Sequence, residues 1–437
     1  MPSPVSGFSK KTKAEKIAWL ASQYLEHDPH AIDVLKNYWN QDPKLQQLHD
    51  DFIENTLTNY YLPLGIAPNF LINNTLYALP MVTEESSVVA AASNAAKFWL
   101  DRGGFQAHVI STVKNGQVHI NYFGKTTELT TFFNQIKPIL IKSIADTQRN
   151  MQKRGGGLID IILVDSTKNL EGYYQLHCTF ETGDAMGANF INTCLESFAN
   201  TLEKEAATHP AFKATNKFPE VVMSILSNYV PDCIVKASVT CKVAELAQKN
   251  ISGEEFATKF VRAIQIAKTE PRRAVTHNKG AMNGVDALVI ATGNDFRAVE
   301  AGVHSYAARD GSYTSLTDAC IEGDTFHFWI EIPLAVGTVG GLTRLHPMAK
   351  VAFKILQQPD AQELMKIIAV SGLAQNFAAV RSLTTTGIQK GHMKMHLMNI
   401  LNQLAATSKE KEKTISHFTN QAVTHSAVVT FVNLLRN

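Results

Sequence analysis

The chain has 437 residues, of which 45% are hydrophobic and 18% are charged, with a formal net charge of +2. This composition predicts a folded globular protein with room for two or three domains, and it excludes an intrinsically disordered chain. The near-neutral charge and the lack of a long basic run argue against a protein that binds nucleic acid.

The cysteines indicate a reducing compartment. The five of them form no Cys-x-x-Cys pair, and an odd, scattered set predicts neither a disulfide framework nor a structural zinc site, so we expect no metal. The N-terminus lacks the apolar core of a signal peptide, and no stretch approaches the 18 or so apolar residues of a membrane span. We therefore expect a soluble, cytoplasmic protein without a membrane partner.

The chain opens with a predicted amphipathic helix. Thr12-x-x-Glu15 is a capping-box pattern, and apolar residues follow at helical spacing from Ile17 to Leu25. Four lysines surround the helix start, and we expect most of them to form a solvated face: Lys10, Lys11, Lys13 and Lys16.

A second helix and a hairpin are predicted next. Ser86 or Ser87 can cap an alanine-rich helix that runs to Leu100. Residues 108–113 and 117–123 then alternate in polarity around Lys114-Asn115-Gly116, which is typical of a β-hairpin.

The following elements predict a compact module. A helix over residues 128–152, punctuated by Pro138, is ended by three glycines from Gly155. Strands follow at Leu158–Val164 and Tyr173–Phe180, and then a helix at Ala188–Ala206. Two strands, a helix, two strands and a helix indicate an α+β module over about residues 108–222, inserted in a larger domain.

The rest of the chain returns to the larger domain, over about residues 222–382. It contains a glycine-rich stretch, Gly337–Gly341, and a helical stretch near Ala361–Val380. The tail from about Thr384 is predicted to be helical, with an exposed charged face.

One stretch combines groups with chemical potential. Thr276–Gly284 is followed by an apolar run, Val285–Ile290, which we interpret as a buried strand, and then by Asp295. Lys279 and Asp295 would thus lie on loops at the two ends of a rigid element, where a lysine can polarise a carbonyl and each group can tune the other. Taken alone, a lysine and an aspartate beside a strand are usually solvated loop charges.

A second stretch, Asp184–Asn189, lies between a predicted strand and a predicted helix. Gly187 permits close backbone approach there, and the helix N-terminus can hold a pyrophosphate. No Gly-x-Gly-x-x-Gly follows a strand, so an ordinary Rossmann site is not indicated. By itself the stretch is only a plausible anion-binding turn, and Gly337–Gly341 could be a plain turn.

These stretches, with residues 84–93 and Gly391-His392-Met393, resemble the class II, bacterial-type 3-hydroxy-3-methylglutaryl-CoA reductases. The four motifs occur in the family's order, and the similarity runs from about Phe8 nearly to the C-terminus. One departure is Thr58, where the family usually has glycine in Glu-Asn-x-x-Gly. Because threonine cannot cheaply take a positive φ, the turn must differ or never needed glycine.

The resemblance implies an α+β fold with three parts. A large mixed domain, residues 1–107 and 223–383, would bind coenzyme A and substrate and form the dimer interface. An inserted ferredoxin-like domain, residues 108–222, would bind the nicotinamide cofactor. Residues 384–437 would form a helical C-terminal flap, hinged at Thr384–Gly387 and Gly391.

It also implies the reaction: the four-electron reductive deacylation of 3-hydroxy-3-methylglutaryl-CoA to mevalonate and coenzyme A, in isoprenoid precursor synthesis. Lys279 would stabilise the oxyanion, and Glu85 would donate a proton if burial raises its pKa. Asp295 would bridge and tune this pair, and His392 would protonate the departing thiolate.

Further residues match the family's binding positions. Arg273 would clamp the substrate carboxylate with two parallel bonds. The other substrate-binding matches are Ser87, Asn283 and Gln375, and the cofactor-binding matches are Asp184, Met186, Gly187, Ala188, Asn189 and Gly340. Ser9 stands where the family has a basic residue near the coenzyme A phosphates, so Lys10 or Lys11 would have to substitute.

Cofactor choice depends on one helix end. Some relatives that prefer NADH carry an aspartate seven residues before the triple glycine, and this chain has Gln148 there, with Arg149, Lys153 and Arg154 close by on the same helix end. A neutral residue removes repulsion of a 2′-phosphate, and a guanidinium could pair with it, so we predict NADPH, with NADH possible. Alternatively, the basic residues only complement the helix C-terminus.

The resemblance implies a homodimer or an assembly of dimers, with Asp295 reaching the site from the neighbouring subunit. The same residues could run the reaction as mevalonate oxidation. Another coenzyme A enzyme, such as an acyltransferase, would need a nucleophilic cysteine or a His-Asp pair, which is not recognisable here. A non-catalytic coenzyme A- or nucleotide-binding regulator would have lost at least one of the four catalytic candidates. All four are present in this chain, which argues against such a regulator.

Overall fold

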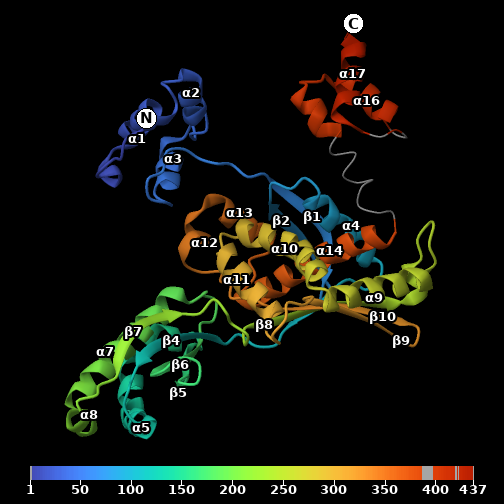
Figure 1. The fold of residues 1–437 in the computed structure, drawn as a ribbon. Coiled ribbons are helices and arrows are strands. Elements are labelled where there is room, and N and C mark those ends of the chain that lie inside the picture. Colours follow the sequence, from blue (N-terminus) through green and yellow to red (C-terminus); the bar gives the residue numbers. More distant parts are fainter. Residues whose placement is uncertain (1, 386–396, 419–420, 422, 437) are drawn as a thin grey trace. The chain divides into compact units, whose positions relative to one another are not determined.

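The protein is described by a computed structural model that covers residues 2–385, 397–418, 421 and 423–436. The chain divides into two compact units, one ending at Pro63 and one beginning at Leu64. Both contain helices, and the second also contains the strands, so the protein has a mixed α/β fold (Figure 1).

The first unit is helical. It contains η1 (Phe8–Lys10), α1 (Lys13–Tyr24), α2 (Pro29–Asn37) and α3 (Pro43–Asp50). The capping box predicted at Thr12 and Glu15 is confirmed, because each side chain bonds the other residue's backbone N–H. Aspartates cap α2 and α3, and each of these helices starts at a proline, whose missing N–H is not needed in the first turn.

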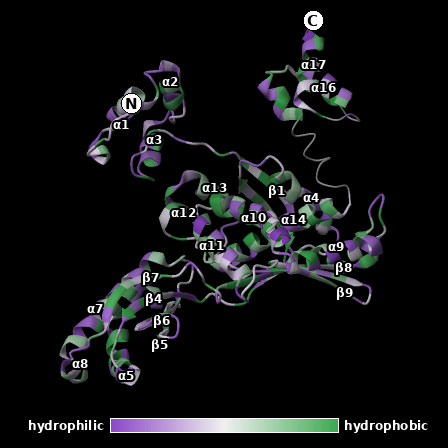
Figure 2. Ribbon diagram, viewed as in Figure 1, coloured by the Kyte–Doolittle hydropathy of each residue, from purple (hydrophilic) through white to green (hydrophobic). Residues whose placement is uncertain are grey.

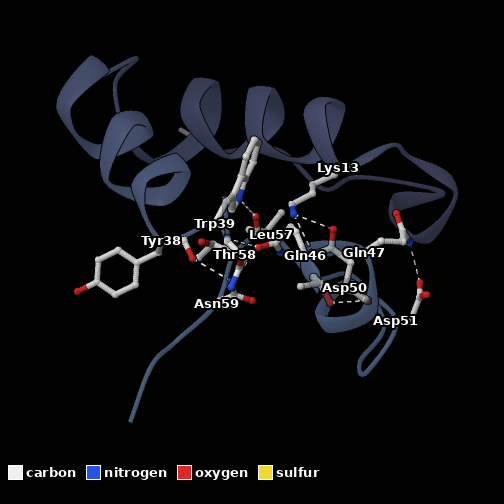
Figure 3. Close-up of polar contacts among 12 residues, drawn as sticks. Lys13, Tyr38, Trp39, Gln46, Gln47, Asp50, Asp51, Leu57, Thr58 and Asn59 are labelled. Atoms are coloured by element: carbon white, nitrogen blue, oxygen red, sulfur yellow. Dashed lines mark hydrogen bonds and ion pairs between the residues drawn. The ribbon is translucent and has the colours of Figure 1, made fainter. Parts of the chain in front are cut away.

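Polar contacts stabilise this unit, since few of its apolar side chains are buried. Lys13 Nζ lies 2.8 Å from both carboxylate oxygens of Asp50, and Trp39 Nε1 donates to Leu57 O at 2.9 Å (Figure 3). Lys16 is only 8% exposed, with its ammonium 5.8 Å from the Phe8 ring centroid. The prediction of a solvated lysine face is therefore wrong for Lys13 and Lys16, whereas Lys10 is exposed.

The turn at the departure from the family pattern needs no glycine at Thr58. Asn55 takes the left-handed conformation, with φ of 59°, which asparagine tolerates well. Thr58 has no positive φ, and its hydroxyl donates to Leu35 O at 2.6 Å. The turn in this chain therefore does not require glycine at this position.

The second unit contains a large helix-and-sheet region. Strands β1 (Leu64–Ile72) and β2 (Thr75–Val82) pair with each other. A four-stranded antiparallel sheet has the order β3-β8-β10-β9, formed by Gln106–Val109, Ile234–Lys242, Thr325–Pro333 and Thr317–Glu322. The helices of the region are α4 (Val88–Leu100), η2 (Val243–Leu246), α9 (Gly253–Thr269), α10 (Pro271–Ala291), α11 (Phe296–Ala307), α12 (Gly341–Leu345), α13 (Pro347–Ile355) and α14 (Ala361–Thr384).

Helices α9, α10 and α14 lie on one face of this sheet (Figure 1). The core is built around α14, which is buried along most of its 24 residues. The helix predicted near Ala361–Val380 is confirmed. Gly284 lets α10 approach α14 closely, because a Cβ there would lie 2.4 Å from Ser371 O.

The predicted strand at Val285–Ile290 is wrong: these residues are the last turns of α10. Lys279 consequently lies in the middle of a helix and not on a loop. The segment is buried on several sides, so apolar residues fill four consecutive positions after Asp286, without helical spacing. Such a run cannot be assigned to strand or helix from periodicity alone.

The inserted module follows the order β-α-β-β-α-β. It contains β4 (Lys114–Asn121), α5 (Thr126–Ser143), α6 (Ala145–Gln152), β5 (Gly157–Asp165), β6 (Tyr173–Glu181), α7 (Ala188–Thr208), α8 (Pro210–Thr215) and β7 (Glu220–Leu226). The strands form an antiparallel sheet in the order β5-β6-β4-β7, and α5 and α7 share its core. Hydrophilic and hydrophobic residues alternate along both helices (Figure 2), as expected for helices covered on one side.

The predicted hairpin around Asn115-Gly116 is wrong. Strand β3 pairs with β8 in the large sheet, whereas β4 belongs to the module and pairs with β6 and β7. Gly116 lies within β4, where a Cβ would come within 2.6 Å of Leu195 Cδ1, so close packing explains this glycine.

The C-terminal residues form a small helical cluster. Helical residues 397–403, α16 (Ser408–His417) and α17 (His425–Arg436) share a core that includes Leu401, Phe418 and Val428. Across the described residues of the whole chain, no helix combines the length and the apolar character needed to cross a bilayer.

Candidate active site

The centre of the site is an ion pair between two distant segments. Lys279, in the middle of α10, places its Nζ 2.8 Å from Glu85 Oε2, in the turn before α4. The side chain of Lys279 is 61% exposed and that of Glu85 is 35% exposed. The structure thus brings together two of the four predicted catalytic residues.

Two predicted substrate-binding residues hold the Glu85 carboxylate. Ser87 occupies the N-cap position of α4, but its hydroxyl makes no cap bond and instead donates to Glu85 Oε1 at 3.0 Å. Asn283, one turn after Lys279 on α10, donates from Nδ2 to Glu85 Oε2 at 3.5 Å. The carboxylate therefore faces donors on both oxygens. Within one chain it is only partly buried, short of the burial expected for a neutral proton donor.

The residues just before Lys279 are structural. His277 is 2% exposed, and its Nε2 lies 2.6 Å from Thr317 Oγ1; burial lowers its pKa to about 3, with help from the positive charge of Arg273. Asn278 donates to Thr314 O and accepts from Leu316 N. These two buried side chains fix α10 against β9 and the preceding loop. Their neighbour Lys279 points outward.

Arg273 and Gln375 carry unsatisfied polar groups. Arg273 is half-buried, its pKa is lowered by desolvation, and within the described ranges its guanidinium has no hydrogen bond or ion pair. Gln375, on α14, is 5% exposed, and its Oε1 has no hydrogen-bond partner in the part of the chain that is described. A half-buried guanidinium without a counter-charge is suited to an anionic ligand group.

Asp295 does not join the pair within the chain. It caps α11, accepting from the backbone N–H of Arg297 and Ala298, and it pairs with the Arg297 guanidinium at 2.9 Å. It follows the far end of α10, where Ala291 is already about 18 Å along the helix axis from Lys279, at 1.5 Å per residue. His392 lies outside the described residues.

The stretch 184–189 forms a turn between β6 and α7, as predicted. Gly187 is the N-cap of α7 with φ of 93°, and a Cβ there would lie 2.4 Å from Thr182 Cγ2, so the position requires glycine. Met186 and Ala188 are half-buried and Asn189 is exposed. The turn leaves the N-terminus of a 21-residue helix accessible.

The second glycine-rich stretch packs against this turn. Thr338 N donates to Asp184 O at 2.8 Å, and a Cβ at Gly337 would lie 2.5 Å from Met186 N. Asp184 Oδ1 accepts from Ala361 N, at the start of α14, at 2.9 Å. Gly340 has φ of 86° and open space around its Cα. Two predicted cofactor segments, about 150 residues apart in the sequence, therefore form one surface.

The two residues predicted to choose the cofactor, Gln148 and Arg149, differ in their exposure to solvent. Gln148 is 7% exposed, and its Oε1 accepts from Leu158 N at 3.3 Å, so it packs α6 onto β5 and is not available to a ligand. Arg149 is exposed and paired with Asp146. The expectation that Gln148 contacts the cofactor is therefore not met.

One residue was missed by the sequence analysis. Lys114, the first residue of β4, is 4% exposed and donates to Thr182 Oγ1 at 2.6 Å, beside the 184–189 turn. In the sequence it preceded Asn-Gly and was interpreted as part of a hairpin turn; nothing local signals that this lysine is buried. Among the described residues, no group of three or more His, Cys, Asp or Glu side chains could hold a metal ion.

Comparison with known proteins gives a consistent result. Residues 14–397 match the protein family described as hydroxymethylglutaryl-coenzyme A reductase. A 3-hydroxy-3-methylglutaryl-coenzyme A reductase from Archaeoglobus fulgidus is 36% identical over 416 residues, 95% of this chain and 90% of that protein. A probable reductase of the same name from Borreliella burgdorferi is 35% identical, over 82% of this chain and 80% of that protein.

A solved structure is also similar. The class II 3-hydroxy-3-methylglutaryl-CoA reductase from Streptococcus pneumoniae, bound to NADPH in open conformations, superimposes with a TM-score of 0.71 at 34% sequence identity. The match covers 88% of this chain and 100% of the streptococcal chain.

Proposed function

The chain belongs to the hydroxymethylglutaryl-coenzyme A reductase family, and from this premise we infer how its own residues serve the family's reaction. That reaction is the reduction of 3-hydroxy-3-methylglutaryl-CoA to mevalonate and coenzyme A, in isoprenoid synthesis. The observation that carries the assignment of residues is the ion pair between Lys279 and Glu85, with Ser87 and Asn283 on the same carboxylate.

Lys279 is the electrophile in this proposal. Reducing a thioester to an alcohol passes through a thiohemiacetal and an aldehyde, and negative charge develops on the carbonyl oxygen at each reduction. An ammonium held by Glu85 at the surface of α10 can stabilise that charge. Glu85, which lies 2.8 Å from the ammonium, can give a proton to the oxygen only in its protonated form, which further burial in the complete site would favour.

Arg273 would bind the distal carboxylate of the substrate, and Gln375, whose Oε1 is an acceptor, would bind a donor group of the substrate. Arg273 is half-buried, and neither it nor Gln375 Oε1 is satisfied by the described residues. A guanidinium can bind a carboxylate with two parallel bonds, and the resulting ion pair would offset the desolvation of Arg273.

NADPH is the reductant, and it supplies the hydride for both reductions. The chain offers donors that suit a dinucleotide: the α7 N-terminus at Gly187, the Gly337–Gly341 backbone and the buried side chain of Lys114. These groups would bind and orient the cofactor. Support for their role comes from the glycine positions, at which side chains would block close approach.

We propose the domain roles on the same basis. The strand order β5-β6-β4-β7 with intervening helices is that of a ferredoxin-like fold, which suits residues 108–222, extended to Leu226, as a cofactor-binding insertion. Residues 1–107 and 223–383 would form the large substrate-binding domain.

Residues 384–437 would form a flap that carries His392 as the acid for the coenzyme A thiolate. Deleting 384–437 should leave substrate binding intact and nearly abolish reduction; full activity of the truncated protein would refute the flap.

A homodimer would complete the site. Asp295 is remote from Lys279 along α10 and has its own partner, Arg297, so we propose that a second subunit supplies the aspartate. Mixing inactive Lys279→Ala and Asp295→Asn chains tests this, because some mixed dimers would have one intact site. Recovery of about a quarter of the activity is expected from random mixing. No recovery from chains shown to exchange subunits would contradict the proposal.

The direct test of function is oxidation of NADPH on addition of 3-hydroxy-3-methylglutaryl-CoA, followed by absorbance. A lack of turnover by the folded protein would contradict the assignment and favour a non-catalytic regulator. Assaying mevalonate with coenzyme A and the oxidised cofactor measures the reverse direction. We also propose a cytoplasmic location, consistent with five free cysteines, of which four are buried.

A further inference from the structure

A chain of polar side chains links α10 to α11. The carboxyl group of Asp286, on α10, is hydrogen-bonded to that of Glu300, on α11. Glu300 Oε2 lies 2.6 Å from Nε2 of His304, one turn further along α11. His304 Nδ1 in turn lies 2.7 Å from the hydroxyl of Tyr313, in the loop before β9. Titratable groups from three segments thus form one continuous chain.

The two carboxyl groups share a proton. A carboxylate only accepts hydrogen bonds, so two carboxyl groups that are bonded to each other hold at least one proton between them. The hydrogen bond from His304 lowers the pKa of Glu300 and favours its ionised form. Burial and the neighbouring Glu300 raise the pKa of Asp286. Asp286 is therefore the neutral partner that donates, and among the described residues Glu300 is the one charged group that acts on it.

Asp286 lies on the same face of α10 as Lys279. The two residues are seven positions apart, about 10 Å along the helix axis. Both side chains lean toward the N-terminus of the helix, and the aspartate is the shorter, so it does not reach the oxygen that Lys279 would contact. Its Oδ1 is buried without a hydrogen-bond partner in the part of the chain that is described. Such an oxygen costs folding free energy, which a purely structural role does not explain.

The acceptor, Glu300, belongs to the helix that begins after Asp295. Asp295 is the N-cap of α11, and Glu300 follows it by five positions, about 7.5 Å along the axis. Beside Glu300, α11 is buried through apolar side chains such as Val299 and Val303, and apolar contact is non-directional. The hydrogen bond from Asp286 therefore fixes the rotation of the first turns of α11, and with it the direction of the Asp295 side chain.

We propose that Asp286 is a positioning residue for the reaction: its neutral carboxyl group holds α11 through Glu300 and thereby orients Asp295. The inference rests on the proposed function, which gives Asp295 its catalytic role. Because the donor is the proton of a carboxyl group, the link between the helices exists only while that proton is bound. Ionisation of Asp286 at alkaline pH would place two negative charges side by side and separate α11 from α10.

Two substitutions separate the proton from the packing. Asp286→Asn keeps the shape of the side chain and donates to Glu300 from its amide at every pH, whereas Asp286→Leu has no donor. The asparagine variant should keep kcat within about twofold of the wild type near neutral pH. The leucine variant should lose kcat by about tenfold or more, with the KM for 3-hydroxy-3-methylglutaryl-CoA nearly unchanged, because misplacing a catalytic group slows the chemical step more than it weakens substrate binding.

The pH dependence of kcat distinguishes positioning from a structural role. Wild-type kcat should fall as the pH rises from about 7 to 10, because Asp286 loses its proton, and this fall should be absent or shifted to higher pH in Asp286→Asn. Tyr306→Phe is the matched control, because it removes a 2.8 Å hydrogen bond to Glu331 from the far end of the same helix. The control should leave kcat and its pH dependence unchanged.

Superimposable pH profiles of the wild type and Asp286→Asn, or full kcat in a folded Asp286→Leu, would overturn the proposal. Thermal unfolding establishes whether each variant is folded, and if the leucine variant is not, the asparagine profile decides. Turnover of 3-hydroxy-3-methylglutaryl-CoA by the wild type tests the reductase function separately, so failure of the proposal would leave that function standing.

Discussion

Replacing Lys279 with alanine should separate activity from stability. The ion pair with Glu85 spans 2.8 Å, but the two side chains are 61% and 35% exposed, and pairs this exposed contribute at most about 1 kcal/mol to folding. Alanine also suits the middle of a helix. Removing one group that stabilises a developing oxyanion, in contrast, typically costs 100- to 1,000-fold in kcat, or about 3 to 4 kcal/mol in the barrier.

The assay follows NADPH oxidation at saturating substrate, and thermal unfolding is measured on the same preparation. We expect turnover to fall by at least about 100-fold and the melting temperature to change by less than about 3 °C. Lys259→Ala is the matched control: Lys259 forms a 2.7 Å pair with Glu255 on the surface of α9, so it loses a comparable ion pair away from the site. Near wild-type turnover by Lys279→Ala, or equal loss in the control, would refute the role of this lysine.

The remaining predictions concern the packing and titration of the same helix. Gly284→Ala should destabilise the fold by about 1–3 kcal/mol in denaturant unfolding, because its Cβ would lie 2.4 Å from an α14 carbonyl oxygen. Gly280→Ala should be neutral or stabilising, because its Cβ would meet nothing closer than 3.7 Å. Equal effects of the two substitutions would contradict the packing argument. Burial holds the folded-state pKa of His277 at about 3, so below about pH 6.5 the unfolded state binds a proton at this imidazole that the folded state does not bind. The free energy of unfolding should therefore fall by up to about 1.4 kcal/mol for each unit that the pH drops from 6.5 to 3. Unfolding curves of His277→Gln should lose that dependence, and an unchanged slope would show that another group is responsible. Burial and the neighbouring Glu300 raise the pKa of Asp286, so the folded state keeps a proton that the unfolded state releases above about pH 4. Asp286→Asn should therefore gain stability over the wild type as pH rises from 5 to 8, and a gain that shrinks with pH would contradict this.

The sequence predicted the elements whose signals are local. The capping box at Thr12 and the strand and helix bounds from Leu158 to Ala206 needed only short-range hydrogen bonds and a one-sided apolar pattern. The motif resemblance gave the family. It also placed Lys279, Glu85, Ser87 and Asn283 among the site residues, and the structure brings these four together although nearly 200 positions separate the first two.

The wrong predictions fall where burial or pairing is decided by distant residues. The segment Val285–Ile290 is helical, and α14 and other core elements surround it. A buried strand and a buried helix would both place its apolar side chains in the core, so its sequence does not distinguish the two. The alternation around Gly116 was real, but the partners of β3 and β4 come from other parts of the chain.

Sequence alone therefore determined the class of protein and the residue types of its chemistry, because these depend on motifs and on local periodicity. Tertiary structure alone decided the environment of each group. It buried Lys114 beside the 184–189 turn, turned Gln148 inward and joined Asp184 to the start of α14. Burial and charge pairing arise when segments far apart in the chain pack together, and no short-range pattern encodes them.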